Sequence, residues 1–250
     1  MQTESDKPLV KEEEIRVSDI EKEEDCSDSV NWFVVAVTLM VTGGLLLITI
    51  IILLIFADFS SNKKKENPNW SPQGNHIKTD WANKVDPKNP WPEYPRPQIV
   101  REDWVNLNGL WDYYLVKKGS IKPKEPTGSI LVPFPIESSL SGVMKTVNEN
   151  DEIWYQRSFT IPSKWQGKNI KLNFGAVDWR CELFINYKSV GTHVGGFAPF
   201  SFDIKPFIDF TKDHFYINVK AYDPTDRNYQ SVGKQTLTPN GIWYTPSSGI

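Results

Sequence analysis

The hydrophobic positions of this chain are concentrated first in one uninterrupted run. Residues 29–57 contain no charged side chain over 29 positions. A helix of about 20 residues already crosses a hydrocarbon core of roughly 30 Å. Thr49 is the one polar side chain of residues 44–56, and its hydroxyl can bond back to its own helix. The run predicts a transmembrane helix; a buried core helix is the alternative, but it would not need every face to be apolar.

After residue 99 the pattern changes to short apolar and aromatic runs separated by turn residues. Residues 215–221 place apolar side chains at every second position, between Tyr216, Asn218 and Lys220. This alternation is typical of a strand with one buried face. Strands are predicted in the same way at 110–116, 153–161, 170–174, 181–186 and 215–221. Regularly spaced short strands predict an all-β fold, a β-sandwich or jelly roll, as one domain over 99–250.

Two further segments flank the apolar run, and neither has the pattern of a packed domain. Residues 1–28 hold four basic and eleven acidic side chains, a net charge of −7, and predict a disordered acidic tail. Residues 58–98 are rich in Pro, Asn and Lys. Because proline fixes φ and removes a hydrogen-bond donor, we expect an extended stalk there.

Charge and cysteine content narrow the class of protein. The residues after position 28 carry 24 basic and 20 acidic side chains, without a basic cluster, so we expect no nucleic-acid partner. A polar, acidic segment precedes the apolar run, whereas a cleavable signal has a short basic start; we therefore expect an uncleaved anchor in the lipid bilayer. Cys26 and Cys181 lie on opposite sides of that anchor and cannot pair.

Several motifs in the β-region occur together in one order. They are Leu-Asn-Gly-Leu-Trp at 107–111, Val-Pro-Phe-Pro at 132–135, Trp-Tyr-Gln-Arg-Ser-Phe at 154–159, Leu-Asn-Phe-Gly-Ala-Val-Asp-Trp at 172–179, Phe-Ile-Asn-Tyr-Lys-Ser-Val-Gly at 184–191, Phe-Ser-Phe-Asp-Ile at 200–204, Asp-Pro-Thr-Asp at 223–226, Gly-Lys-Gln at 233–235, and Gly-Ile-Trp-Tyr-Thr-Pro at 241–246 before Gly249-Ile250. The series resembles the N-terminal sugar-binding domain of family 2 glycoside hydrolases, which include β-galactosidases, β-glucuronidases and β-mannosidases. The resemblance implies a galactose-binding-like jelly roll.

The resemblance also implies partners in the same polypeptide. In complete members an immunoglobulin-like domain and a (β/α)₈ barrel follow, and the barrel carries the two catalytic glutamates. The chain stops at Ser248-Gly249-Ile250, where the family pattern enters the last strand of the domain. We therefore expect a sheet short of one strand, no catalytic residue in this chain, and no activity of the chain alone.

The predicted carbohydrate contacts lie in one Gly/Pro-rich loop. Trp243 is the candidate for stacking on a sugar, with Tyr244 and Asn240 beside it. In the galactosidase and glucuronidase branches an aspartate that reaches the active site stands at the position of Trp243, so this chain departs from those branches. For Trp111, Trp154 and Trp179 core packing is the expected role.

The remaining polar side chains do not form a catalytic set. Asp151 and Glu152 are adjacent on a predicted strand, so their side chains should point to opposite faces. Asp223 and Asp226 are expected to cap backbone amides in a turn; a calcium site is the alternative. The three histidines lie in unrelated segments without metal-ligand spacing, and we predict no metal and no cofactor.

Two functions remain for the chain. In the first it is the membrane-anchored N-terminal part of a family 2 glycoside hydrolase, whose β-domain packs against the barrel. In the second it is a non-enzymatic, membrane-anchored carbohydrate-binding or scaffolding module. Under both, glycans lie on the extracytoplasmic side, which predicts a single-pass type II protein at the cell surface or in a lumenal compartment. An open reading frame continuing past Ile250 would favour the first function.

Overall fold

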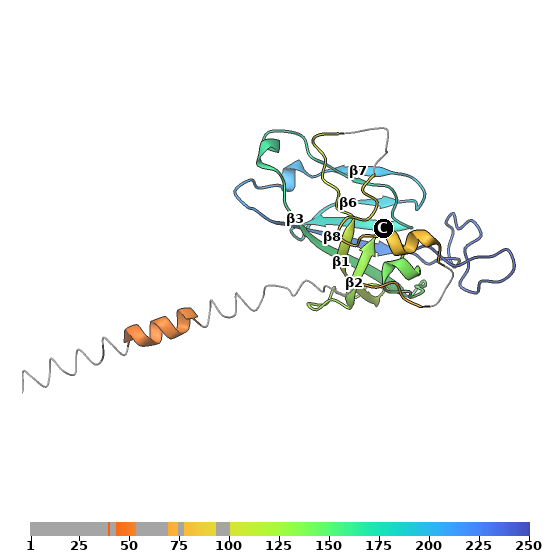
Figure 1. The fold of residues 1–250 in the computed structure, drawn as a ribbon, viewed down its shortest axis with the longest axis horizontal. Coiled ribbons are helices and arrows are strands. Elements are labelled where there is room, and N and C mark those ends of the chain that lie inside the picture. The colour runs from red at the N-terminus through yellow and green to blue at the C-terminus, as the bar shows by residue number, and fades with distance from the viewer. Residues whose placement is uncertain (1–39, 41–43, 54–69, 75–77, 94–100) are drawn as a thin grey trace, which may run out of the picture. The chain divides into compact units, whose positions relative to one another are not determined.

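The computed structural model describes Met40 and residues 44–53, 70–74, 78–93 and 101–250. The chain divides into two units, Met1–Glu66 and Asn67–Ile250. In the first unit residues 44–53 are helical and exposed (Figure 1). The Thr49 hydroxyl donates to the Leu46 carbonyl (2.8 Å), the local bond that the sequence allowed. Among the described residues no helix has both the length and the apolar character needed to cross a bilayer. Most of the predicted helix 29–57 and all of the predicted tail 1–28 lie outside the described residues.

The second unit is a sandwich of antiparallel strands (Figure 1). Its strands are β1 (Gly109–Lys117), β2 (Gly128–Val132), β3 (Asp151–Phe159), β4 (Lys171–Phe174), β5 (Arg180–Ile185), β6 (Lys188–Val194), β7 (Phe200–Asp203) and β8 (Phe215–Tyr222). Short 3₁₀ helices are η2 (Asp80–Lys84), η3 (Ser139–Ser141), η4 (Ser163–Trp165) and η5 (Lys205–Phe207). One sheet has six strands in the order β2-β1-β3-β8-β5-β6, and the other has two, β4-β7.

The five predicted strands are confirmed, and the described residues form three further strands. β6 has no clear alternation, because it lies at an edge and is mostly half-buried or exposed, which explains why its sequence does not stand out. β2 is only five residues long. β7 lies within the motif at 200–204, whose four strand residues are too few to establish a period by themselves. Within the six-stranded sheet, the sequence pattern therefore locates the inner strands better than the edge strands β2 and β6.

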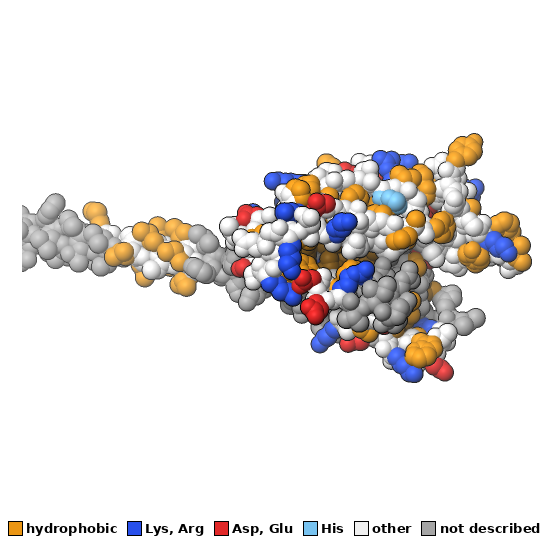
Figure 2. All heavy atoms as spheres, turned by 90° about the horizontal axis from the view of Figure 1, so that it is seen from above, with side chains coloured by type: hydrophobic (Ala, Val, Ile, Leu, Met, Phe, Trp, Pro, Cys, Tyr) orange, Lys and Arg blue, Asp and Glu red, His pale blue; other side chains and the backbone are white. Residues whose placement is uncertain are grey.

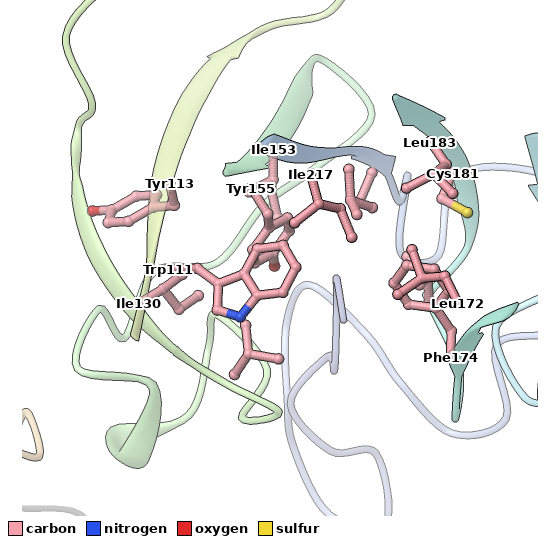
Figure 3. Close-up of a cluster of buried hydrophobic side chains, with 14 of the residues drawn as sticks. Trp111, Tyr113, Ile130, Ile153, Tyr155, Leu172, Phe174, Cys181, Leu183 and Ile217 are labelled. Atoms are coloured by element: carbon pink, nitrogen blue, oxygen red, sulfur yellow. The ribbon is translucent and has the colours of Figure 1, made fainter. Parts of the chain in front are cut away.

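The core lies between the two sheets and follows from the alternation of the strands. In β8 the side chains of Phe215, Ile217 and Val219 are buried, as predicted from their spacing. They pack with side chains from β1, β3, β4 and β5 (Figure 3). Hydrophobic burial of this kind contributes roughly 25 cal/mol per Å² and is the main favourable term of folding.

The predicted core role holds for one of three tryptophans. Trp111 is 4% exposed, but Trp154 and Trp179 are only partly buried. Trp154 alternates with the buried Ile153 and so projects from the other face of β3, where its ring stacks on Phe184 with centroids 5.4 Å apart. The prediction was wrong for Trp154 because composition does not reveal which face of a strand is covered.

Part of the predicted stalk packs against the β-domain instead of extending freely. The Trp70 indole donates to the Leu140 carbonyl (2.9 Å), and the Gln73 amide donates to the Ser139 carbonyl (3.0 Å). Ala82, in η2, is buried. The described residues of 70–93 thus belong to the same unit as the sandwich. The extended stalk was predicted from proline content, which reveals neither the 3₁₀ helix η2 nor the carbonyl partners that η3 supplies.

Candidate carbohydrate-binding site

Three loops meet at one end of the sandwich. They are the connection from β4 to β5, the connection from β6 to β7, and the segment after β8. The Gly195 amide donates to the Trp179 carbonyl (2.8 Å), which joins the first two. Asp178 and Gly249 exchange two antiparallel backbone bonds of 2.9 and 3.1 Å, which join the first and third. This loop end brings together residues separated by more than 70 positions in the sequence.

Three buried carboxyl groups lie beneath this loop end. Glu137, Asp178 and Asp223 are exposed by only 8%, 8% and 4%. Ser248 links two of them, because its amide donates to Glu137 Oε2 (2.9 Å) and its hydroxyl donates to Asp223 Oδ2 (2.7 Å). Asp223 also accepts bonds from the Thr225 amide and the Gln230 side chain. The acidic groups therefore hold the segment around Ser248 in place.

Two of these three acids, Glu137 and Asp178, have pKa values above those of ordinary surface acids. Burial, followed by the nearby carboxylates of Asp223 and Glu137, raises the pKa of Asp178 to about 7. Burial also raises the pKa of Glu137, against the lowering effect of the Ser248 bonds. At neutral pH the cluster thus carries less negative charge than its composition suggests. Neighbouring acids that share a site are expected to behave in this way.

Two glycines allow the backbones of the loop end to approach one another. A side chain at Gly249, where φ is +94°, would collide with the Tyr155 hydroxyl. A side chain at Gly196 would collide with the Asp178 carboxylate. Only glycine fits at Gly249 on both conformational and steric grounds. Because both positions are glycine, the segment after β8 can approach Tyr155 closely, and the loop between β6 and β7 can approach Asp178 closely.

The predicted carbohydrate-contact residues form one turn in this region. The Trp243 amide donates to the Asn240 carbonyl (2.9 Å), and Gly241 between them has a φ of +53°. The Tyr244 amide donates to the Lys234 carbonyl (3.0 Å), which fixes the base of the turn. The side chains of Trp243 and Tyr244 remain 48% and 53% exposed. The structure therefore brings the three residues together, with the rings of Trp243 and Tyr244 open to solvent. The side-chain amide of Asn240 donates a hydrogen bond to the Thr238 carbonyl within the same loop.

Further exposed hydrophobic side chains occur in the same loops. Ile242 is 67% exposed, and Phe197, next to Gly196, is 63% exposed. Figure 2 shows hydrophobic side chains on protrusions at one end of the β-domain, while basic and acidic side chains are interspersed over the face in view. Clustered exposed aromatic groups mark binding surfaces more often than isolated ones do. An aromatic face can stack on the apolar face of a sugar ring, and neighbouring backbone groups can bond its hydroxyls.

Asp223 and Asp226 have the partners expected of turn-capping residues. Asp226 Oδ2 accepts bonds from the Leu237 amide (3.0 Å) and the Thr236 hydroxyl (2.9 Å), and the Leu237 bond is the main reason that the pKa of Asp226 is lowered. Asp223 caps the Thr225 amide (2.7 Å). Within the described part of the chain no group of three or more His, Cys, Asp or Glu side chains is arranged to hold a metal ion.

The adjacent acids at the start of β3 diverge, as predicted. Asp151 pairs with Lys117 (2.8 Å), whereas Glu152 accepts a bond from the Gly119 amide (2.9 Å) and pairs with Lys220 (3.1 Å). Their separate partners follow from the alternation of side chains along a strand.

A cleft of about 920 Å³ opens between the two sheets. Its lining is mainly apolar and includes Trp111 and Val132 from the large sheet, Leu172 and Phe174 from β4, and Ile250. Lys168 and Lys171 also contribute to its wall. The sequence contains no signal for this cleft, because it depends on how far β4 and β7 extend over the six-stranded sheet.

Sequence reasoning missed the buried acids of the loop end. Asp178 belongs to the motif at 172–179, but nothing in that motif identifies it as a titrating group, and no motif includes Glu137. The neighbouring Gly175 signals a loop after the strand, but no local pattern predicts burial of a carboxyl group. The partners of Asp178 come from other parts of the chain, so tertiary contacts alone reveal its surroundings.

The described residues thus form an antiparallel β-sandwich domain that has an exposed aromatic turn at Trp243 and three buried acids at its loop end. The sequence profile described as "Glycosyl hydrolases family 2, sugar binding domain" matches residues 125–235. This part of the chain is therefore similar to the sugar-binding domain of that family, which is the family that the sequence motifs resemble.

Similar proteins with curated names are longer than this chain. It is 26% identical over 121 residues to a β-glucuronidase of Paenibacillus borealis, covering 44% of this chain and 20% of that protein. It is 33% identical over 79 residues to a β-galactosidase of Thermoanaerobacter pseudethanolicus, covering 32% and 10%. Among solved structures it is similar to a Lactobacillus rhamnosus β-glucuronidase, with 27% identity, a TM-score of 0.42, and coverage of 50% and 22%. The chain spans about a fifth of the length of the β-glucuronidases of Paenibacillus borealis and Streptococcus agalactiae.

Proposed function

We propose that this chain is the N-terminal, membrane-anchored part of a family 2 glycosyl hydrolase, an enzyme that hydrolyses O-glycosyl bonds. The observation that carries the proposal is the match of residues 125–235 to the sugar-binding domain of that family. Similarity to proteins named β-glucuronidase and β-galactosidase supports the same reaction class. The sandwich would then be a galactose-binding-like jelly roll.

In this proposal the β-domain assists catalysis rather than performing it. The acid/base and nucleophile would come from a barrel C-terminal to Ile250, with an immunoglobulin-like domain between the sandwich and the barrel. The exposed aromatic loop around Trp243 would lie at the contact with these domains or with a glycan. Trp243 stands where two branches of the family have an aspartate, so a sugar other than galactose or glucuronic acid is compatible with the proposal.

The anchor and its orientation are part of the same proposal. The charge-free run 29–57 supports a transmembrane helix, and the need of a glycosidase for extracytoplasmic substrates supports a type II topology. The acidic tail 1–28 would face the cytosol. In sealed vesicles whose cytosolic face is outward, protease should remove the tail and leave the β-domain intact until the membrane is permeabilised. Digestion of the β-domain in the sealed vesicles would overturn this topology.

The native size of the protein tests the enzymatic proposal most directly. An antibody against residues 107–235 should detect a band near or above ~100 kDa, because further domains of roughly 100–250 residues each would follow. Immunoprecipitates of that band should hydrolyse aryl glycosides. A band near the 28.7 kDa of this chain would overturn the proposal.

A second function is favoured by the exposed rings of Trp243 and Tyr244, which suit direct binding of a glycan by the β-domain alone. The full chain in detergent micelles should then bind immobilised glycans saturably. Trp243→Ala should weaken that binding roughly tenfold or more, a loss typical of an aromatic contact that becomes buried on binding. Trp81→Ala is the matched control, because Trp81 is 71% exposed and lies in η2, outside the loop. Equal losses from both substitutions would contradict a site at Trp243.

A further inference from the structure

The segment that carries the aromatic turn leaves the core twice and returns to it once in between. Of residues 226–245, all of which the structure describes, Gln235 alone is buried, with 9% of its surface exposed. The residues on either side of it, 227–234 and 236–245, are partly or fully exposed. A buried polar side chain needs hydrogen-bond partners, because an unpaired one costs free energy. Gln235 is therefore the place where this protruding segment is attached to the core.

The backbone of Gln235 lies directly beside the turn. Gln235 forms a parallel bridge with Tyr244. The bridge consists of two bonds of 3.0 Å, from the Tyr244 amide to the Lys234 carbonyl and from the Thr236 amide to the Tyr244 carbonyl. A displacement of Gln235 therefore moves the backbone that carries the rings of Trp243 and Tyr244.

The side chain of Gln235 has partners in two other parts of the chain. Its Oε1 atom accepts a hydrogen bond from the Ser247 amide, which closes the base of the turn on the far side. Burial and the Asp223 carboxylate raise the pKa of Asp178, and a hydrogen bond from the Gln235 side chain opposes that rise. The next residue, Ser248, is itself bonded to the buried acids through its amide and its hydroxyl. Gln235 thus joins the turn to the acid cluster that holds Ser248.

The bond between Gln235 and Asp178 depends on the charge of the carboxyl group. A hydrogen bond that lowers the pKa of an acid is stronger when the acid is ionised. The charged groups that act on Asp178 are Glu137, which precedes η3, and Asp223, which follows β8; both are acids and disfavour its ionisation. Gly196, in the loop between β6 and β7, packs against the carboxylate and brings no charge. Among the groups that act on this carboxyl, Gln235 is the one that favours the ionised form.

We propose that Gln235 is the positioning residue of the candidate carbohydrate-binding site: docked between Ser247 and Asp178, it holds the Trp243–Tyr244 turn in place, and it holds the turn more firmly when Asp178 is ionised. The inference rests on the second proposed function, in which this turn binds a glycan, and it adds regulation by pH. Because coupling between two equilibria is reciprocal, a glycan that requires the docked turn would bind more tightly above the pKa of Asp178 than below it. Unfolding instead exposes Asp178, so the overall stability falls over the same range of pH.

Hydrogen exchange of the Tyr244 amide, measured by NMR on the full chain in detergent micelles, tests the positioning role. Gln235→Met keeps the length of the side chain and removes its donor and its acceptor. This substitution should speed exchange at Tyr244 roughly tenfold or more, because the docked turn opens more often. Gln156→Met is the matched control, since Gln156 is 5% exposed but accepts its bond from Tyr114 on the large sheet. Equal acceleration by both substitutions, or none by Gln235→Met, would overturn the proposal.

The titration of Asp178, followed by carbon-13 NMR of its carboxyl group, separates positioning from a merely structural role. The pKa of Asp178 should be higher in the Gln235→Met protein than in the unsubstituted chain, because the bond that lowers it is gone. A fall towards ~4, the pKa of an exposed aspartate, would mean that the acid cluster has opened and would overturn the proposal. In the unsubstituted chain, exchange at Tyr244, corrected for the intrinsic effect of pH, should slow roughly fivefold between pH 6 and 8.

Gln235→Glu keeps the test decisive if Gln235→Met does not fold, which exchange at the fully buried Val219 reports. The carboxyl group of this variant can accept the Ser247 bond, but its charge would repel the ionised Asp178. Corrected exchange at Tyr244 should therefore be faster at pH 8 than at pH 6, the reverse of the unsubstituted chain. The same direction in both proteins would overturn the proposal. Absence of glycan binding would end the second proposed function without changing these exchange measurements.

Discussion

The two halves of the sandwich bury similar side chains from water but differ in how tightly they are packed. On the side of β5 and β8, Leu183 and Val219 are 0% exposed, and neither lines the cleft. On the side of β1 and β2, Trp111 and Val132 are only 4% and 2% exposed, yet they border a space of about 920 Å³. The first half is covered by β4 and β7, and the second lacks a covering strand among the described residues. A side chain can therefore be hidden from solvent without being closely packed. The stability cost of a substitution should differ between the two halves for this reason.

The largest effect is expected when a leucine is truncated in the covered half. Leu183→Ala should lower the free energy of unfolding by about 2–5 kcal/mol, because it leaves a new cavity in close-packed surroundings. Leu107→Ala, at the cleft, should cost about 1 kcal/mol, since that side chain is half-buried and already borders open space. Urea unfolding measures both. Equal costs would show that the two halves are packed alike.

Adding a methylene group should have opposite consequences in the two halves. Val219→Ile should cost about 1–3 kcal/mol through overpacking. Val132→Ile should be neutral or should stabilise by up to about 1 kcal/mol, because the cleft accommodates the added group. The difference between the two valines is measured by the denaturant midpoint. A destabilised Val132→Ile protein with an unchanged Val219→Ile protein would reverse the comparison.

The loop end outside both halves, where Asp178 pairs with Gly249, should change its contribution to stability with pH. The pKa of Asp178 is raised to about 7, so the folded protein holds this proton at pH values where the unfolded chain has lost it. Its contribution to stability is complete below about pH 4 and is lost as the pH rises through about 7. Asp178→Asn should therefore flatten the decline of stability between pH 5 and 7 in thermal unfolding measurements.

The control for this pH effect is an exposed acid with the opposite shift. Hydrogen bonds from Thr211 lower the pKa of Asp209, so that group is ionised throughout the range from pH 5 to 7. Asp209→Asn should leave the slope in that range unchanged. An equal flattening by both substitutions would show that the slope is a property of net charge and not of the buried cluster.

The smallest effect is expected at the rim of the cleft. The Asp103 carboxylate contacts Lys164 (2.8 Å) and Lys168 (2.6 Å), which lower its pKa, but all three side chains are exposed. Exposed ion pairs are weak and are screened by salt. Asp103→Asn should lower the melting temperature slightly at low ionic strength and have no effect at about 1 M NaCl. A large loss that persists in salt would assign these residues a structural role in closing the cleft.

The strands and the exposed loop could be predicted because their signals are local. The alternation in β8 identifies its buried face, and the Gly/Pro-rich sequence around Trp243 predicts a loop that exposes its rings. The motifs also indicated the family 2 sugar-binding domain. The alternation of a strand and the preference of Gly and Pro for turns both depend on residues that are neighbours in the chain. The sequence alone therefore determines these two features.

Other features depend on residues that meet only after folding. Glu137, Asp178 and Asp223 come from three separate loops. Burial raises the pKa of Glu137 and of Asp178, and the Asp223 carboxylate, which folding brings near both of them, raises these two pKa values further. Trp154 shows the same limit, because the covered face of its strand is decided by which sheet packs above it. The cleft beside β4 follows from six strands facing two. Tertiary structure decided these features because burial, electrostatic coupling and packing all depend on distances between segments that are remote in the sequence.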